Sequence, residues 1–263
     1  MSNNNESIGK TFAVVIGLCL VCAIFVATAA VGLRPKQTEN KLLDAQKNIL
    51  SAVGMLDNGA DVKTQFEKHV QIRLVNLDTG EFVDQDPLSY DYRKMMKDPS
   101  GSISLTEAED IAKIKTRANI APVYLAYTNG VESKDISFVV LPIHGYGLWS
   151  TMHGFLALDK DGNTIKGLKY YEHGETPGLG GEIQNPTWTA QFVGKKLLDD
   201  AGNPAIKILK PGNAAPGAVS DVDGLSGATL TSNGVQNSFT FWSGAKGFAP
   251  FLTKVRQGAL NNG

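Results

Sequence analysis

The sequence predicts an α+β fold with a mainly antiparallel sheet and helices, preceded by one N-terminal transmembrane helix. Residues 11–33 contain no charged side chain. From residue 121 onward, short apolar segments follow one another with short connections, and Asp161-Gly162 between two of them is typical of a β-hairpin. Near the C-terminus, Val235, Phe239 and Trp242 recur at helical spacing.

Composition excludes some classes of protein. The 263 residues include 25 Lys and Arg against 26 Asp and Glu, so the chain lacks the basic excess of a nucleic-acid surface, and we expect no nucleic-acid partner. Both cysteines, Cys19 and Cys22, lie in the apolar run, where we interpret them as small apolar side chains. The rest of the chain therefore contains no disulfide.

The first two segments are a short tail, residues 1–10, and a transmembrane helix, residues 11–33. A helix of this length spans about 35 Å, which is enough for the hydrocarbon core of a bilayer. The small residues Ala27-Thr28-Ala29 also resemble a signal-peptide cleavage site. Because the run is long for a signal and Lys10 is the one cation before it, we interpret it as a retained single-pass anchor in lipid.

The charges that flank the anchor predict its orientation. Arg34, Lys36, Lys41 and Lys47 follow the apolar run, whereas Lys10 precedes it. Positive charges favour the cytoplasmic side, so this pattern alone places the following domain in the cytoplasm.

A juxtamembrane helical and mixed region, residues 34–120, comes next. Its apolar spacing and turn residues predict two helices, then a hairpin, then a polar excursion that could contain one more helix. In order, these are helices 38–53 and 62–69, strands 71–76 and 81–83, and the possible helix 106–115.

Residues 121–263 form the predicted main domain. Apolar, β-rich runs predict four strands, 123–127, 136–141, 154–158 and 164–171. Asn185-Pro186 suits a helix start and predicts a helix to about residue 198. The last predicted helix carries Val235, Phe239 and Trp242 on one face, with Ser232 and Asn233 as candidate caps.

The segment before that last helix is the most informative in the chain. Residues 223–229 read Asp-Gly-Leu-Ser-Gly-Ala-Thr, so two glycines permit a tight turn directly before a helix. The free N–H groups of a helix N-terminus bind phosphate well, and Thr229 adds a hydroxyl there. An ordinary capping turn would have a similar sequence, and both interpretations stay open at this point.

Two further glycine-rich segments carry candidate site residues. Residues 172–182 hold four glycines and a proline around Glu175, Thr176 and Leu179, which is typical of a shaped loop. Residues 144–150 place Trp149 beside glycines, where the ring could edge a flat ligand or pack in the core. We interpret Glu175 and Glu182 as solvated loop carboxylates. We interpret His144, His153 and His173 as solvated or locally bonded, and expect no catalytic residue and no metal site.

The motif at residues 223–229 resembles the covalent flavin attachment motif of the FMN-binding domain family. The resemblance implies an FMN joined to Thr229 through a phosphoester, within a motif that includes Asp223, Ser226, Gly227 and Ala228. The segment Glu175–Gly180 is similar to the second signature of that family, which implies that Thr176, Leu179 and Gly180 lie beside the flavin. The family has a stretch similar to the one around Trp149 near its cofactor.

Over nearly its whole length, the chain resembles the C-subunit family of the bacterial Na+-translocating NADH:quinone oxidoreductases. This implies an electron-transfer component of a translocase, with other membrane subunits as partners and a flavin transferase for maturation. It also implies an inner-membrane protein whose large domain, the FMN-binding domain of residues 121–263, is periplasmic, against the charge pattern. Alternatives are an Rnf-type flavoprotein subunit, which is typically shorter over residues 56–130, and a non-redox anchored scaffold.

Overall fold

A computed structural model describes residues 8–57, 59–258 and 260 of the chain. It divides into two compact units, one ending at Asp44 and one beginning at Ala45, and each is described by itself. Helix α1 (Ile8–Ala52) begins in the first unit and ends in the second. Among the described residues, it is the one helix long and apolar enough to cross a membrane.

Helix α1 corrects the prediction of two separate helices at 11–33 and 38–53. The structure has a single helix of 45 residues with Pro35 inside it. A proline in a helix removes one backbone hydrogen bond and bends the helix without necessarily ending it. After Pro35, the hydroxyl of Thr38 donates to the carbonyl of Arg34, one turn earlier in the same helix.

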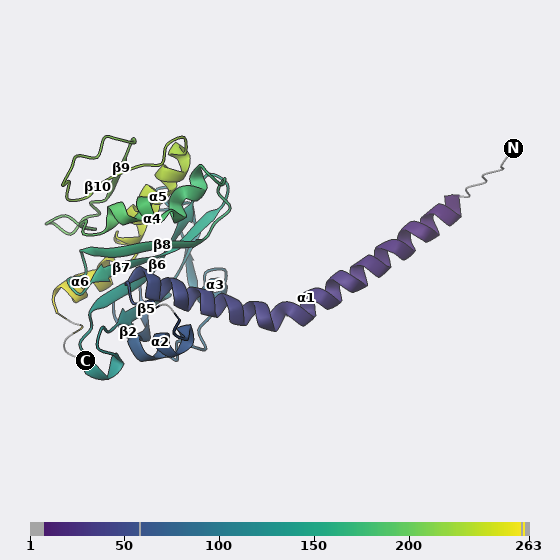
Figure 1. Ribbon diagram of the computed structural model, residues 1–263, viewed down its shortest axis with the longest axis horizontal. Helices are drawn as coiled ribbons and strands as arrows, with labels where there is room; N and C mark the ends of the chain where they lie inside the picture. Colours follow the sequence, from purple (N-terminus) through teal and green to yellow (C-terminus); the bar gives the residue numbers. More distant parts are fainter. Residues whose placement is uncertain (1–7, 58, 259, 261–263) are drawn as a thin grey trace. The chain divides into compact units, whose positions relative to one another are not determined.

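A six-stranded antiparallel sheet forms the centre of the second unit, and this confirms the predicted fold class (Figure 1). Its strands lie in the order β2-β1-β5-β6-β7-β8. Their bounds are β1 (Val70–Asn76), β2 (Phe82–Val83), β5 (Ile120–Ala126), β6 (Phe138–Tyr146), β7 (Thr151–Asp159) and β8 (Ile165–Glu172). The hairpin expected at Asp161-Gly162 joins β7 to β8, and Gly162 has a positive φ of 65°.

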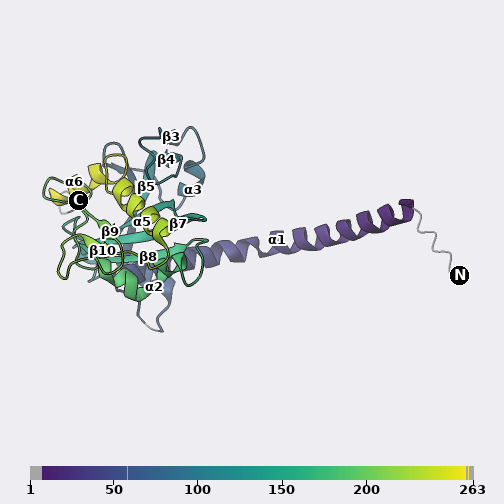
Figure 2. The ribbon, with the colours of Figure 1, turned by 90° about the horizontal axis from the view of Figure 1, so that it is seen from above.

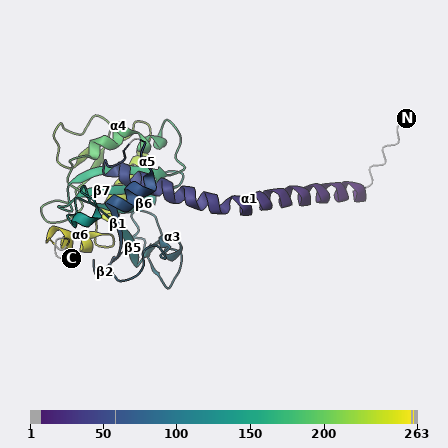
Figure 3. The same cartoon turned by 60° about the horizontal axis from the view of Figure 1, so that its bottom comes forward.

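Successive residues of a strand point to opposite faces of the sheet, and the sheet is buried on both. Leu141 and Leu156 belong to the core on one face, whereas Val140 and Phe155 belong to the core on the other. The last turn of α1 and helix α2 (Val62–His69) cover this second face, which comes forward in Figure 3. A Cβ at Gly167 of β8 would lie 2.1 Å from the carbonyl oxygen of Ala52, so only glycine permits this approach.

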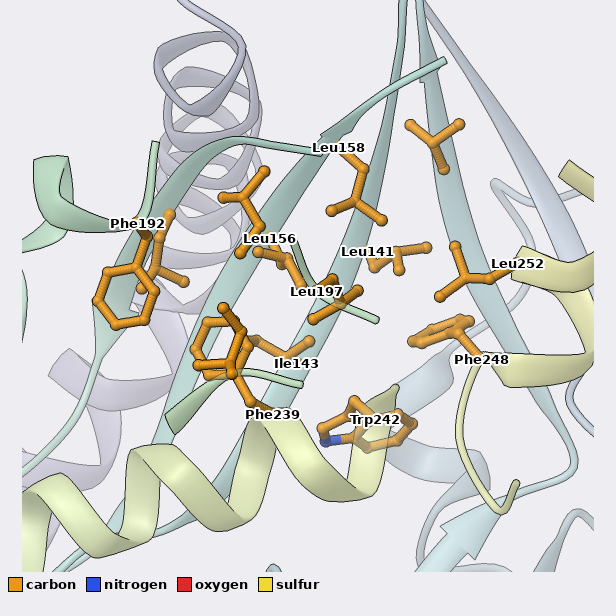
Figure 4. Packing of buried hydrophobic residues seen from close by; sticks show 14 of the residues in the cluster. Leu141, Ile143, Leu156, Leu158, Phe192, Leu197, Phe239, Trp242, Phe248 and Leu252 are labelled. Atoms are coloured by element: carbon orange, nitrogen blue, oxygen red, sulfur yellow. The ribbon is translucent and has the colours of Figure 1, made fainter. Parts of the chain in front are cut away.

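Helices α5 (Thr229–Trp242) and α6 (Ala249–Arg256) contribute to the core on the first face. The predicted apolar stripe of α5 is confirmed, since Val235, Phe239 and Trp242 are each at most 2% exposed. Figure 4 shows Phe239 and Trp242 pointing from α5 toward Ile143, Phe192 and the sheet. The sheet thus fixes the axis of α5, and with it the place where the helix begins.

The remaining elements are short. A small parallel sheet, β9–β10, lies beside α5 (Figure 2), and β10 leads into the turn before that helix. The bounds are α3 (Tyr92–Met95), β3 (Ser102–Ser104), β4 (Thr116–Ala118), η1 (Val131–Ser133), η2 (Gly180–Gln184), α4 (Pro186–Thr189), η3 (Ala190–Phe192), β9 (Lys207–Leu209) and β10 (Asp221–Asp223).

Three local predictions need correction: the helix left open at 106–115, the end of the helix after Asn185, and the bounds of the strands predicted at 136–141 and 154–158. Residues 106–115 form turns, because the Asp110 carboxylate accepts from the backbone N–H groups of Ile114 and Lys115 and so competes with a helix. The helix that begins after Asn185 ends as a 3₁₀ turn at Phe192, whose buried ring stacks on Phe239. Strand β6 runs to Tyr146 and β7 begins at Thr151, so residues 147–150 form the turn of a hairpin.

Candidate functional site

The turn before α5 is held by its own side chains. Gly227 has a φ of +73°, which favours glycine, and Gly224 lies so close to the carbonyl oxygen of Leu209 that a Cβ would be 2.8 Å from it. The hydroxyl of Ser232 accepts from the N–H of Leu225 at 3.0 Å. Ser232 was expected to cap α5, but it lies within the helix and folds back to fix the turn instead.

Thr229 is the first residue of α5, and its side chain is exposed. The cap position is Ala228, whose side chain offers no hydrogen bond, so the cap expected at Ser232 or Asn233 was wrong. The first N–H groups of a helix have no partner within the helix. An uncapped N-terminus with an exposed hydroxyl is an arrangement that fits a phosphate group.

Glu175 connects three segments at this site. One of its carboxylate oxygens accepts from the hydroxyl of Thr231 at 2.6 Å, which attaches the loop of Glu175 to the first turn of α5. The carboxylate also accepts from the backbone N–H groups of Leu148, Trp149 and Ser150, with a shortest distance of 2.9 Å. A single buried carboxylate therefore fixes the hairpin turn, its own loop and the helix relative to one another.

The environment of Glu175 corrects the prediction that it is solvated, since the residue is only 4% exposed. Burial raises the pKa of the carboxyl, but the hydrogen bonds from Thr231 and the hairpin turn outweigh burial and hold the pKa below its ordinary value. Two glycines make room for the carboxylate. A Cβ at Gly147 would lie 2.6 Å from its oxygen, and a Cβ at Gly180 would lie 2.5 Å from the Thr231 hydroxyl.

Large apolar side chains on the three connected segments remain exposed. Trp149 is 64% exposed, Leu230 is 58% exposed and Leu179 is 44% exposed. Leu179 adjoins the turn before α5, because a Cβ at Gly227 would be 3.2 Å from its Cδ2 atom. The interpretation of Trp149 as core packing was therefore wrong. We call Leu148, Trp149, Leu179 and Leu230 the apolar rim.

Thr176, Asp223 and Ser226 have different surroundings. Thr176 is exposed, and its carbonyl accepts from the N–H groups of Leu179 and Gly181, which shapes the loop. The Asp223 carboxylate accepts from the N–H groups of Asn213 and Ala214 at 2.9 and 2.8 Å, so it holds a neighbouring loop. Ser226 is exposed within the turn.

The three histidines lie in unlike environments. Of the two expected states, solvated or locally bonded, the first does not hold for His144, which is 4% exposed and stacks on His153 with ring centroids 5.3 Å apart. Burial lowers the pKa of His144 to about 3 and that of His153 to about 4, and both rings are neutral at pH 7. His173 is locally bonded as expected, since its Nδ1 atom accepts from the N–H of Glu175.

Comparison with known proteins agrees with this arrangement. The FMN-binding domain family matches residues 147–243, which contain the hairpin turn, the loop of Glu175 and the start of α5. The C subunit of the Na(+)-translocating NADH-quinone reductase of Vibrio anguillarum is 56% identical over 262 residues, which cover 99% of this chain and 100% of that protein. The C subunit of the Yersinia pestis enzyme is 54% identical over 263 residues, with 99% and 97% covered. The chain belongs to this C-subunit family.

A solved structure of the family has the same fold. The crystal structure of Shewanella oneidensis NqrC aligns with a TM-score of 0.74 at 39% identity, and covers 81% of this chain and 97% of that one. Membership of the C-subunit family, together with the FMN-binding domain, supports the role of an electron-transfer flavoprotein. The C-subunit proteins are parts of an oxidoreductase complex, so the activity belongs to the complex.

The three segments that sequence patterns singled out lie together in the structure, but the contact that joins them was not predicted. Thr229, Leu179, Gly180 and Trp149 lie on segments that converge at the start of α5. The role of Glu175 was missed because a loop carboxylate carries no pattern of its own. Glycines in both segments, such as Gly147 and Gly180, were the signal that could have indicated a buried polar group close to the backbone.

Proposed function

We propose that this chain carries one FMN, joined through its phosphate to the Oγ1 atom of Thr229, and passes electrons between redox centres of neighbouring subunits in a Na+-translocating NADH:quinone reductase. The observation that carries the proposal is the exposed Thr229 at the uncapped start of α5, next to the apolar rim. Glu175 fixes the segments that bear these groups.

The residues of the site have distinct tasks in this proposal. The first N–H groups of α5 hold the phosphate, and the positive end of the helix dipole favours its charge. Trp149 and Leu179 offer apolar surface that shields a flat aromatic ring from water. Bound FMN supplies the redox chemistry, while the protein positions it and tunes its electronic properties.

A covalent bond suits an electron carrier, because a tethered cofactor cannot be diluted by dissociation. A threonine hydroxyl is unreactive alone, so we propose that a separate flavin transferase makes the bond and recognises part of residues 223–229. Expression without such an enzyme should give a folded, colourless chain. Flavinylation of the purified apoprotein by FAD alone would contradict this part of the proposal.

Peptide mapping tests the attachment directly. We expect the proteolytic peptide that contains Thr229 to carry the mass of FMN less one water, and fragmentation to place that mass on Thr229. A flavin mass on the peptide but on Thr231 would contradict the assignment. Thr231 is 1% exposed and donates to Glu175, which argues against its hydroxyl as the acceptor. A chain with no flavin mass would favour an anchored scaffold.

The division of the chain and its place in the cell are also proposed. Residues 121–263 form the FMN-binding domain, since the hairpin turn, the loop of Glu175 and the attachment turn all lie within them. Helix α1 anchors the chain in the bacterial inner membrane by one span, and the large domain is periplasmic. Protease added to intact spheroplasts should then degrade the domain. Complete protection would show that the flanking charges determine the orientation.

A further inference from the structure

A hollow of about 290 Å³ opens beside the proposed flavin site. It lies between the β6–β7 hairpin and the first turns of α5, and its lining includes Leu148 and Leu230 of the apolar rim. Gly234 permits this close approach of helix and hairpin, because a Cβ there would be 2.4 Å from the carbonyl oxygen of Tyr146. Since Leu230 directly follows Thr229, the hollow is adjacent to the proposed attachment point.

Lys113 carries the one formal charge among the described residues that line this hollow. The other polar side chains on its wall include the amides of Asn233 and Asn237. The nearby carboxylate of Glu175 lies behind the hairpin turn, where three backbone N–H groups and the Thr231 hydroxyl donate to it. Lys113 is thus the charged residue on the wall of the hollow itself, while the Glu175 carboxylate lies behind Gly147.

The backbone around Lys113 is held in an unfavourable conformation. Lys113 and Lys115 have φ angles of 54° and 67°, in the left-handed region that side chains other than Gly, Asn and Asp rarely adopt. The Asp110 carboxylate keeps this turn by accepting from the N–H groups of Ile114 and Lys115. The carbonyl of Ala112 accepts from the N–H of Tyr146 at 2.8 Å, which fixes the turn against the hairpin. These hydrogen bonds hold Lys113 in place at the wall of the hollow.

We propose that Lys113 tunes the flavin electrostatically, by stabilising the negative charge that the ring gains when it takes up more electrons than protons. The inference rests on the proposed function, because it assumes the flavin on Thr229. A cation near the reduced ring favours the reduced form and raises its midpoint potential. Because the hollow is open to solvent, added salt weakens the effect.

Lys115 provides a matched control. It has the same charge and the same left-handed backbone, but it does not line the hollow beside the proposed flavin site. It lines a second hollow, with Arg93 and Lys97, which Lys113 also borders. Replacing either lysine by glutamine removes one positive charge and leaves the strain. Replacing either by glycine removes the charge and relieves the strain, so the glycine variants should fold even if the glutamine variants do not.

The test is a spectroelectrochemical titration of the full-length, flavin-loaded chain in detergent, at low and high salt. We expect Lys113→Gln and Lys113→Gly to lower the midpoint potential equally, Lys113→Arg to keep it, and both Lys115 variants to lower it less. The difference between the positions should shrink at high salt. Equal shifts at the two positions, or no shift for Lys113→Gly, would overturn the inference while leaving the attachment to Thr229 intact. A wild-type chain without in-gel flavin fluorescence would overturn the proposed function and this inference together.

Discussion

The two sides of the hairpin turn at residues 147–150 differ in which side chains are buried and which are exposed. On the inner side, a charged residue is buried, and the Glu175 carboxylate accepts from three backbone N–H groups and from Thr231. On the outer side, large apolar residues are exposed, with Trp149 at 64%. Buried polar groups are costly unless they are hydrogen-bonded, and a contiguous exposed apolar patch marks a binding surface. The contrast indicates that the inner side maintains the structure and that the outer side is available to a ligand.

The largest expected difference in unfolding free energy is between alanine variants of two tryptophans, Trp242 and Trp149. Trp242 is 2% exposed and donates from Nε1 to the carbonyl of His144, so Trp242→Ala should cost about 3 to 5 kcal/mol of unfolding free energy. Trp149→Ala should change it by less than about 0.5 kcal/mol, because the ring packs little in the folded chain. Urea unfolding of both variants in detergent measures the difference. Similar losses would show that Trp149 stabilises the fold.

Glu175→Gln should have the next largest effect. The amide places N–H groups where a carboxylate accepts from backbone N–H groups, so we expect a loss of about 2 kcal/mol. Glu182→Gln is the control, because the Glu182 carboxylate accepts from the Asn185 side chain in a partly buried position, and its loss should stay below about 1 kcal/mol. Equal losses of unfolding free energy for the two variants would contradict the claim that Glu175 joins the hairpin turn, its own loop and helix α5.

The pH dependence of stability divides into two windows. His144 has a folded pKa of about 3, below its unfolded value of about 6.5, so the unfolded chain binds more protons and stability falls as pH drops below 6.5. The folded pKa of Glu175 is also lowered, so its contribution is complete above about pH 4.3 and is lost at lower pH. His144→Phe should reduce the slope of the first window, to which His153, with a folded pKa of about 4, also contributes. Glu175→Gln should reduce the slope of the second window. Unfolding curves between pH 7 and pH 3 measure how steeply stability depends on pH in each window. An unchanged slope in either variant would contradict the contribution assigned to the replaced residue.

The smallest effect on stability should come from the apolar rim. Leu179→Asp adds a charge at an exposed position, so we expect a change in unfolding free energy of less than about 0.5 kcal/mol. The same charge should disfavour the reduced, anionic flavin by on the order of 1 kcal/mol and lower the midpoint potential, while the proposed covalent bond to Thr229 would retain the cofactor. Redox titration and absorbance spectra of the purified chain provide the readout. An unchanged potential would mean that the loop lies away from the ring.

Sequence patterns predicted the parts of the fold that depend on local periodicity. The long apolar helix, helix α2, the sheet strands and the apolar stripe of α5 all follow from the spacing of apolar residues. The failures occurred where side-chain hydrogen bonds decide the local structure, as at Asp110, whose carboxylate accepts from Ile114 and Lys115 and stabilises turns in place of a helix. Likewise, no local pattern could show that Ser232 binds the preceding turn, or that Glu175 reaches Thr231 across 56 positions of sequence.

In-gel flavin fluorescence of Thr229→Ala tests the central claim most directly. The matched control is Thr187→Ala, which removes another exposed threonine from the first turn of a helix, α4. Co-expressed with a flavin transferase and denatured, the wild-type chain and Thr187→Ala should show a fluorescent band, and Thr229→Ala should show none. A fluorescent band for Thr229→Ala at wild-type intensity would contradict the assignment of the flavin to this residue.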